Sequence, residues 1–452
     1  MTDLLSSVQA ALGLPHTPIA LTSEGALPSA FAVTELASAS IAAAGQATAG
    51  LLLEQTGRLP GLSVDRRLAS FWFATSLRPL GWHVPPLWDP VAGDYPSQDG
   101  WIRLHTNAPH HRQAAERVLG QATDRAAMAA RVAQWKAHDL EQAVVEAGGC
   151  AAQMRSWSEW QVHPQGQAVN AEPLAHFLSR HGDAALPWRG SPARPLAGIR
   201  VLDLTRVLAG PIASRFLAGL GADVLRIDPP HWIEPGVVPE VTLGKRCARL
   251  NLHDAADRQV FEHLLAHADL LLHGYRADAL ERLGYGAAER QRLAPGLIDV
   301  SLNAYGWSGP WQKRRGFDSL VQMSCGIAEA GQRWQQADKP WPLPVQALDH
   351  ATGYLMAAAA IRLLAERLQT AAVGSARLSL ARTAKLLFEH APDRTEAALR
   401  AEDPDDQGLL VEQTPWGPAH RLRVPLHLSG TPLQWDLPAS DLGAHRPQWQ
   451  AL

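Results

Sequence analysis

Asp349 is the residue whose place in the chain most directly suggests chemistry. It immediately precedes 350–367, a stretch with few helix breakers that predicts a helix. An aspartate at such a place commonly caps the helix by accepting N–H groups of the first turn. The same N–H groups and the helix dipole also keep a carboxylate ionised, which leaves it available as a nucleophile. The residues alone leave both roles open.

A second candidate is the loop closed by Ala209-Gly210-Pro211, which joins a predicted strand to a predicted helix. The strand, 199–204, is short and largely apolar, as expected of a parallel strand covered on both faces. Pro211 suits a first helical position, Gly219 and Gly221 suit the end of the helix, and a second apolar strand follows at 223–227. A strand-to-helix turn of this kind can hold an anion such as a phosphate or pyrophosphate.

Three histidines, His105, His110 and His111, lie close together in the sequence. Their spacing is loose, the segment between them is a predicted turn and no cysteine is near, so we predict no metal site. They are expected to cap the next helix or to line an acceptor pocket. The three cysteines of the chain are widely spaced, which favours a reducing compartment over a disulfide framework.

Composition excludes several classes of function. The chain has 452 residues, of which 46% are hydrophobic and 19% charged, and its formal net charge is −3. It is therefore expected to hold more than one compact unit and to bind no nucleic acid. The N-terminal residues lack the basic start and long apolar core of a signal peptide, and no uninterrupted apolar run reaches the length of a membrane span. We therefore predict a cytoplasmic protein with no membrane association.

Four segments are predicted along the chain. Residues 1–182 form the first, with a half-buried strand at 101–105 and a helix over 114–145. A proline-rich linker follows at 183–195. The α/β segment occupies 196–388, and 389–452 form a C-terminal return with a strand near 423–428.

Several short motifs of the α/β segment occur together in a fixed order. They are 196–228, Gly244-Lys245-Arg246, Ala268-Asp269 with Tyr275, 280–284, 306–310, Gly316-Phe317-Asp318 and Leu348-Asp349-His350. In order and spacing, the chain from about Leu196 to about Phe388 resembles the family III CoA-transferases. These include formyl-CoA transferase and carnitine CoA-transferase, and the α-methylacyl-CoA racemases are related to them.

The resemblance implies a fold and an activity. The fold is α/β, with a Rossmann-like parallel sheet in the large domain, a smaller α+β domain that would be residues 1–182, and interlocked homodimers. The activity is transfer of CoA from an acyl-CoA donor to a carboxylic acid acceptor through an aspartyl anhydride and an aspartyl-CoA thioester. Coenzyme A would be present as the acyl-CoA substrate, with no metal.

The resemblance also implies roles for individual residues. Asp349 stands where the family has its nucleophile. Nine other residues stand where the family lines the CoA site, with Arg282 placed for the CoA phosphates and Arg315 near the pantetheine: Val207, Leu208, Ala209, Leu250, Gly274, Tyr275, Arg282, Leu283 and Arg315. Two departures, Pro229 in place of an arginine and Gly274 in place of an asparagine, remove expected contacts on the adenine side.

Phe317 bears on the choice between related activities. The racemases that this sequence resembles have a histidine there, which serves as one of two acid–base groups. Phenylalanine cannot exchange a proton near neutral pH, so we predict transferase activity over racemase activity. A catalytically silent CoA-binding or partner subunit is the remaining alternative. The sequence does not identify the acyl donor or the acceptor.

The order of the segments is unusual for the family, because the small domain here precedes the nucleotide-binding half. A weak internal repeat offers one explanation. Ala42-Ala43-Ala44, Leu62-Ser63 and Arg66 match Ala358-Ala359-Ala360, Leu378-Ser379 and Arg382 at one constant offset. This alignment predicts a worn copy of one helix-and-strand unit, with Val33 opposite Asp349. Permutation and trimmed duplication both remain open.

Overall fold

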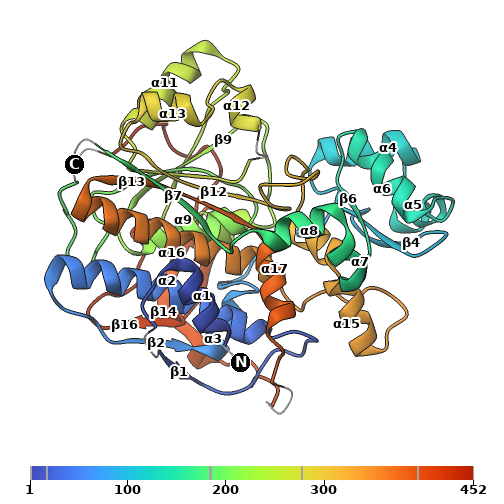
Figure 1. The fold of residues 1–452 in the computed structure, drawn as a ribbon, viewed down its shortest axis with the longest axis horizontal. Helices are drawn as coiled ribbons and strands as arrows, with labels where there is room; N and C mark the ends of the chain where they lie inside the picture. The colour runs from blue at the N-terminus through green and yellow to red at the C-terminus, as the bar shows by residue number, and fades with distance from the viewer. Residues whose placement is uncertain (1–2, 17–18, 183–185, 276–277, 394–396, 451–452) are drawn as a thin grey trace.

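A seven-stranded sheet forms the centre of the computed structural model, which describes residues 3–16, 19–182, 186–275, 278–393 and 397–450. Adjacent strands of this sheet pair in parallel, except at one edge, where β13 and β7 are antiparallel (Figure 1). The predicted α/β class with a large, mostly parallel sheet is confirmed. In sheet order the strands are β10 (Arg246–Arg249), β9 (Asp223–Asp228), β8 (Arg200–Leu204), β11 (Leu270–His273), β12 (Ile298–Asn303), β13 (Ala372–Ser379) and β7 (His176–His181).

Helices cover both faces of this sheet, and alternate residues of its strands enter two different cores. Leu270 and Leu272 point into the core that holds α9 and α16, whereas Leu271 points into the core beneath α11. This is the burial expected of parallel strands between two helical layers. The helices are α9 (Ala209–Gly219) and α16 (Ala347–Thr370) on one face, and α11 (Ala255–Ala266), α12 (Ala279–Arg282) and α13 (Ala287–Leu293) on the other.

The predicted strand–loop–helix turn is present as β8 and α9. The helix begins at Ala209, so Pro211 is its third residue and not its first. The proline still lies among the first four residues, whose N–H groups have no partner inside the helix.

A small lobe projects from the large domain on the right of Figure 1. The single helix predicted over 114–145 is wrong, because Gly120, with a φ of +81°, ends one helix and Asp124 caps the next. The lobe has its own apolar core beneath a three-stranded sheet. Its elements are β4 (Gly93–Pro96), β5 (Trp101–Leu104), β6 (Ala151–Gln153), α4 (Pro109–Leu119), α5 (Arg125–Val132) and α6 (Ala137–Glu146).

The predicted unit 1–182 occupies three places. Its first third packs against the large domain, its middle forms the small lobe and β7 joins the large sheet. A third small sheet, β14-β15-β3, combines the two ends of the chain. The remaining elements are α1 (Leu4–Leu12), β1 (Ala20–Thr22), α2 (Val33–Thr56), β2 (Leu62–Asp65), α3 (Arg66–Trp72), β3 (Leu77–Pro79), α7 (Trp157–Val162), α8 (Pro164–Ala171), α10 (Val238–Val241), α14 (Asp318–Ser324), α15 (Ile327–Gln335), α17 (Leu380–Glu389), the 3₁₀ helix Pro404–Asp406, β14 (Gln407–Thr414), β15 (Gly417–Leu422) and β16 (Leu426–Leu428).

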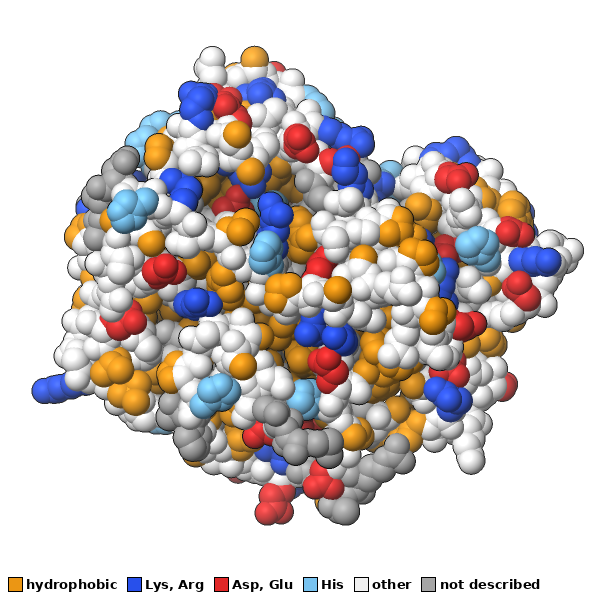
Figure 2. Space-filling model, in the orientation of Figure 1, with side chains coloured by type: hydrophobic (Ala, Val, Ile, Leu, Met, Phe, Trp, Pro, Cys, Tyr) orange, Lys and Arg blue, Asp and Glu red, His pale blue; other side chains and the backbone are white. Residues whose placement is uncertain are grey.

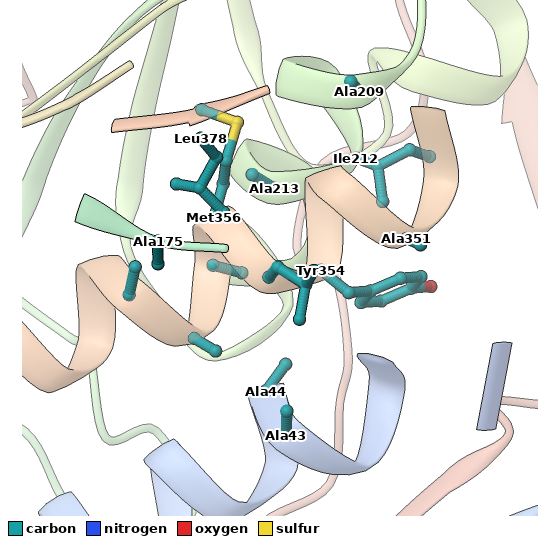
Figure 3. Packing of buried hydrophobic residues seen from close by; sticks show 14 of the residues in the cluster. Ala43, Ala44, Ala175, Ala209, Ile212, Ala213, Ala351, Tyr354, Met356 and Leu378 are labelled. Carbon is teal, nitrogen blue, oxygen red and sulfur yellow. The ribbon is translucent and has the colours of Figure 1, made fainter. Parts of the chain in front are cut away.

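Helix α2 lies beside α16 in the core. By length and composition it could cross a membrane, but 89% of its apolar window is buried inside the protein. Figure 3 shows Ala43 and Ala44 of α2 beneath α16, where Tyr354 lies close by. Small side chains let two helix backbones approach closely, so α2 packs here as a core helix.

The structure contains the predicted repeat as two helix–strand–helix units, α2-β2-α3 and α16-β13-α17. Both long helices have 24 residues and end in the left-handed conformation, at Gly57 and Ala371. Both begin after the same inverse γ-turn, centred on Ala32 (φ −74°, ψ 61°) and on Gln346 (φ −76°, ψ 64°). The side chains of Asp65 and Ser379 cap the second helices in the same way, each accepting an N–H three residues ahead.

The matching helix ends of the two units correct the alignment of Ala42-Ala43-Ala44 with Ala358-Ala359-Ala360. Counted from the first residue of each long helix, Asp349 is third in α16 and Glu35 is third in α2. The strand ends Asp65 and Ser379 agree with this register. The prediction that Val33 stands opposite Asp349 is therefore wrong by two residues, because alanine-rich helices match one another at several offsets.

The two units also exchange strands. In each unit the strand lies between one parallel and one antiparallel neighbour: β13 between β12 and β7, and β2 between β1 and β16. The antiparallel strand comes from the other part of the chain in both cases. β7 follows the small lobe of the first part and pairs with β13, whereas β16 follows the second part and pairs with β2.

Candidate active site

A cleft of about 270 Å³ lies between the ends of the large-sheet strands and the small lobe. Figure 2 shows the molecule hollowed between the upper helices and this lobe, with Lys and Arg side chains on the rim. Loops after β8, β11 and β12, the start of α16 and the start of α4 all reach the cleft. Its lining includes Asp349, five of the nine predicted CoA-site residues and both histidines of α4: Val207, Ala209, Gly274, Tyr275, Arg315, His110 and His111.

A buried ion pair fixes the loop between β8 and α9. Asp203, at the end of β8, lies 3.2 Å from Lys245 Nζ, and neither side chain is exposed. Asp203 also accepts the N–H of Thr205 at 2.8 Å, and Lys245 donates to the carbonyl of Pro211 at 2.9 Å. Burial lowers the pKa of Lys245 to about 8, against the opposing effect of Asp203. These bonds hold both ends of the loop that lines the cleft.

Val207 sits in this loop with a φ of +64°. The left-handed conformation raises the conformational free energy of a β-branched residue, and such strain is concentrated at functional sites. Its N–H donates to Glu234 Oε2 at 3.0 Å, which holds the backbone in place.

Asp349 lies inside the first turn of α16 and does not cap it. The capping side chain is Asp318 from α14, which accepts the N–H groups of Leu348 at 2.9 Å and of Asp349 at 3.0 Å. The helix N–H groups that the sequence assigned to Asp349 are therefore bound by a second carboxylate. This leaves the side chain of Asp349 on the wall of the cleft.

The electrostatics of Asp349 differ from the expectation that it stays ionised. Burial first, and then the nearby carboxylate of Asp318, raise its pKa well above the ordinary value of an aspartate. Burial also raises the pKa of Asp318 to about 6, although Asp318 accepts two backbone N–H groups and a bond from Gln322. Since the hydrogen bonds favour charge on Asp318, the free protein holds its proton on Asp349.

Arginines line the same cleft. The guanidinium of Arg206 lies between two rings, 4.4 Å from the centre of Trp232 and 4.8 Å from that of Tyr275, and donates to the hydroxyl of Tyr275 at 2.9 Å. Arg315 donates to the carbonyl of Gly148 at 2.8 Å. Cations and an aromatic platform suit a phosphate-bearing ligand.

Four predicted CoA-site residues lie elsewhere. Leu250 and Leu283 belong to the core beneath α11, and Leu208 packs with Val237 and Val241. Arg282 is 67% exposed and pairs with Asp278 at 2.7 Å. None of these four lines the cleft.

The small lobe brings His110 and His111 to the cleft, whereas His105 lines the hollow beside it. That they line an acceptor pocket stays a prediction. The other expectation, that a histidine caps the helix, is wrong, since Ala108 stands at the cap position of α4. His105 is buried and stacks on Phe317 with ring centres 3.8 Å apart. Burial lowers the pKa of His111 to about 3, so this ring is neutral. Among the described residues, no group of three or more histidine, cysteine or acidic side chains is arranged to hold a metal ion.

Sequence reasoning missed several lining residues, notably Arg206, Trp232, Asn303 and Arg314. Arg206 directly precedes Val207 in the predicted anion-binding loop, and this proximity is the one signal that could have identified it. Trp232 is one of sixteen tryptophans, which gave no means of choosing it.

Comparison with known proteins finds a matching family model and several relatives. The family model described as CoA-transferase family III matches residues 196–408. The resemblance to the family III CoA-transferases is confirmed. An "Acyl-CoA transferase" of Gibberella moniliformis is 33% identical over 206 residues, which are 43% of this chain and 36% of that protein. The human "Succinyl-CoA:glutarate CoA-transferase" is 32% identical over 170 residues, 33% of this chain and 39% of that one.

A third relative comes from Mycobacterium tuberculosis. It is named "Probable fatty acyl-CoA transferase Rv3272" and is 33% identical over 191 residues, 39% of this chain and 48% of that protein. Its crystal structure aligns with 44% of this chain and 58% of its own at 29% identity, with a TM-score of 0.39. The chain spans about half or less of the length of these curated relatives.

Proposed function

We propose that this protein is a CoA-transferase that moves CoA from an acyl-CoA donor to a carboxylic acid through covalent intermediates on Asp349. The observation that carries the proposal is one cleft in which Asp349 lies together with five residues predicted to bind CoA. The arginines of the same cleft suit the phosphates of CoA. The relatives named as CoA-transferases support this reading.

The first half-reaction releases the donor acid. The ionised Asp349 oxygen attacks the thioester carbonyl, the C–S bond breaks and CoA leaves as a thiolate, giving an acyl-aspartyl anhydride. The thiolate then attacks the aspartyl carbonyl of the anhydride, and the donor acid leaves as a carboxylate. Asp349 now carries CoA as a thioester, and one difficult transfer has been divided into easier steps.

The second half-reaction runs the same steps in reverse order with the acceptor. The acceptor carboxylate attacks the aspartyl-CoA carbonyl and releases the thiolate, which leaves a second anhydride. The thiolate attacks the acceptor carbonyl of that anhydride, and Asp349 is regenerated as a carboxylate. The first attack needs Asp349 without its proton, so the raised pKa makes the rate of that step rise with pH.

An acyl-CoA racemase is the second candidate, because the structure brings a histidine to the cleft by another route. His111 of the small lobe lies against Phe317, with ring centres 5.7 Å apart, and both line the cleft with Asp349. Its low pKa disfavours it as a proton acceptor. Exchange of the α-hydrogen of a 2-methylacyl-CoA for deuterium in heavy water, without acyl transfer, would favour the racemase.

Trapping with hydroxylamine tests the transferase. Protein incubated with hexanoyl-CoA should form an adduct that hydroxylamine cleaves, and Asp349→Ala should form none. Glu35→Ala is the matched control, because it removes the corresponding carboxylate of the other repeat unit. An unmodified protein that forms no adduct with any acyl-CoA would support the silent CoA-binding alternative.

Acyl-CoA and a carboxylate are thus the proposed partners, with coenzyme A as a substrate and no metal. The cytoplasmic location and the interlocked homodimer implied by the resemblance stay predictions.

A further inference from the structure

A second hollow of about 220 Å³ adjoins the cleft. Val207, Trp232, His111 and Phe317 line both spaces, so they form the passage between them. Phe317 directly precedes Asp318, which bonds to the backbone of Asp349. The passage therefore begins beside the carboxyl group to which an acyl carbonyl must come.

The walls of this chamber are largely apolar. They carry Leu87, Trp88, Ile233 and Val237 in addition to the shared residues. The rings of His105 and His111 are both neutral, because burial lowers the pKa of each. Among the described residues that line it there is no lysine or arginine. The cationic cleft and this chamber thus differ sharply in chemistry.

The only carboxylates on the walls are already bound to other groups in the described part of the chain. Asp89 accepts from Thr106 at 2.7 Å and pairs with Arg112 at 3.0 Å. Glu234 accepts from Val207 and Trp232 and pairs with Arg226. A second carboxylate on the ligand would find no unpaired cation among the described lining residues, because Arg112 and Arg226 already pair with Asp89 and Glu234.

We propose that this chamber holds the acyl chain of the substrate and selects an apolar acyl group that lacks a second carboxylate. The proposal rests on the proposed CoA-transferase activity. It assigns the substrate class to monocarboxylic acids with an aliphatic or aromatic chain, and it excludes dicarboxylic acids such as succinate.

The test is a series of acyl-CoA donors in the trapping reaction. From acetyl- to hexanoyl-CoA, the second-order rate constant for adduct formation should rise about fourfold for each methylene that the chamber buries. Succinyl-CoA should react on the order of 100-fold more slowly than hexanoyl-CoA, because its free carboxylate stays unpaired.

Substitutions at the chamber wall make the test specific. Ile233 is 58% exposed, so Ile233→Arg can be tolerated by the fold while it supplies the missing cation. It should lower the rate with hexanoyl-CoA and raise the rate with succinyl-CoA. Leu409→Arg, at a side chain 98% exposed on β14, is the control and should change neither rate. Trp88→Ala, at a half-buried ring, should move the preference towards longer chains.

The outcomes separate the two proposals. Adduct from succinyl-CoA at the hexanoyl-CoA rate, or rates that ignore chain length, would overturn the chamber and leave the transferase intact. Absence of adduct from every thioester would overturn both.

The exchanged strands carry a second, independent inference. The cleft is lined by His110 and His111 from the first part of the chain and by Asp349 and the β8 loop from the second. β7 and β16 cross between the two repeat units in opposite directions. We infer that the two parts of one chain act as an internal pair, so that a single chain holds a complete cleft and needs no second copy. This inference replaces the homodimer that the resemblance implies.

Size-exclusion chromatography with light scattering measures the mass of the protein in solution, so it tests this inference without depending on catalysis. We expect a monomer of 48.9 kDa that binds one CoA per chain, with the same affinity from micromolar to nanomolar protein. His110→Ala with His111→Ala should weaken CoA binding in that monomer. A dimer at every concentration, or loss of CoA binding on dilution to monomer, would overturn the inference.

Discussion

The two repeat units share a backbone and differ in what faces the start of their long helices. In α16 the third residue, Asp349, is buried beside Asp318 and lines the cleft. In α2 the third residue, Glu35, is partly exposed and pairs with Arg66 at 2.8 Å. The same helical position thus holds a carboxyl group with a raised pKa in one unit and a carboxylate in an ion pair in the other. A carboxylate at the start of a helix is a candidate nucleophile only when no cationic side chain pairs with it permanently.

Removing each carboxylate in turn should separate the units most clearly. Asp349→Ala should lower the transfer rate on the order of 10⁴-fold or more, as loss of a nucleophile does. Glu35→Ala should leave the rate within about twofold, since its ion pair lies outside the cleft. Steady-state transfer with hexanoyl-CoA measures both, and equal losses would remove the functional distinction between the units.

The loop opposite Asp349 depends on a buried ion pair. Lys245→Met leaves Asp203 buried without its cation, and the free energy of unfolding should fall by about 3–5 kcal/mol. Urea unfolding followed by circular dichroism measures the loss. Arg66→Met, which breaks the partly exposed pair with Glu35, is the control and should cost about 1 kcal/mol, less than Lys245→Met.

Burial of an ionisable group at position 349 lowers stability near neutral pH, so replacing Asp349 by asparagine should stabilise the fold. The pKa of Asp349 and that of Asp318 are raised by folding, so between pH 4 and pH 7 the unfolded chain releases these protons more readily and the free energy of unfolding falls. Asp349→Asn should therefore stabilise the protein at pH 7, and this gain should shrink to almost nothing below pH 4, where the aspartate is protonated in both states. Thermal unfolding across this range checks the sign. A loss of stability at pH 7 would contradict the raised pKa.

Asp318 should control the pH dependence of the reaction. In Asp318→Asn the side-chain oxygen can still accept the N–H groups of α16, but the neighbouring negative charge is gone. The pKa of Asp349 should fall, and the rising limb of the rate against pH should move to lower pH. An unchanged profile would mean that Asp318 does not act on Asp349 through its charge.

The smallest effect is expected at the satisfied pair. Glu35→Gln should lower the free energy of unfolding by about 0.5 kcal/mol, and by less at high salt, because the pair is partly exposed. Thermal unfolding at low and high salt measures it. A stabilising effect would mean that Glu35 resembles Asp349 more than its contacts indicate.

Local patterns predicted the parts of the fold that depend on neighbours in sequence. The apolar runs at 199–204 and 223–227 became β8 and β9, and Asp349 lies at the start of the helix expected there. The helix predicted for the small lobe is too long, because Gly120 ends one helix and Asp124 caps the next. The sequence indicated a repeat, but the residue-by-residue alignment of its two units required the γ-turns and helix caps of the structure.

Long-range contacts account for what the sequence could not supply at the site. Asp318 takes the helix N–H groups only because α14 folds back on α16, and this reverses the expected state of Asp349. His110 and His111 enter the cleft because the small lobe docks against the large domain. Four leucine or arginine positions chosen by resemblance lie outside the cleft, since motif order gives no side-chain direction.

The most direct test of the central claim is to locate the acyl group after a brief reaction with hexanoyl-CoA. Peptide mass spectrometry with hydroxylamine should find a hydroxamate on Asp349, in the peptide that begins α16, and none on Glu35. A modified Glu35 or Asp318, or an unmodified Asp349 in protein that turns over, would contradict the assignment of Asp349 as the nucleophile.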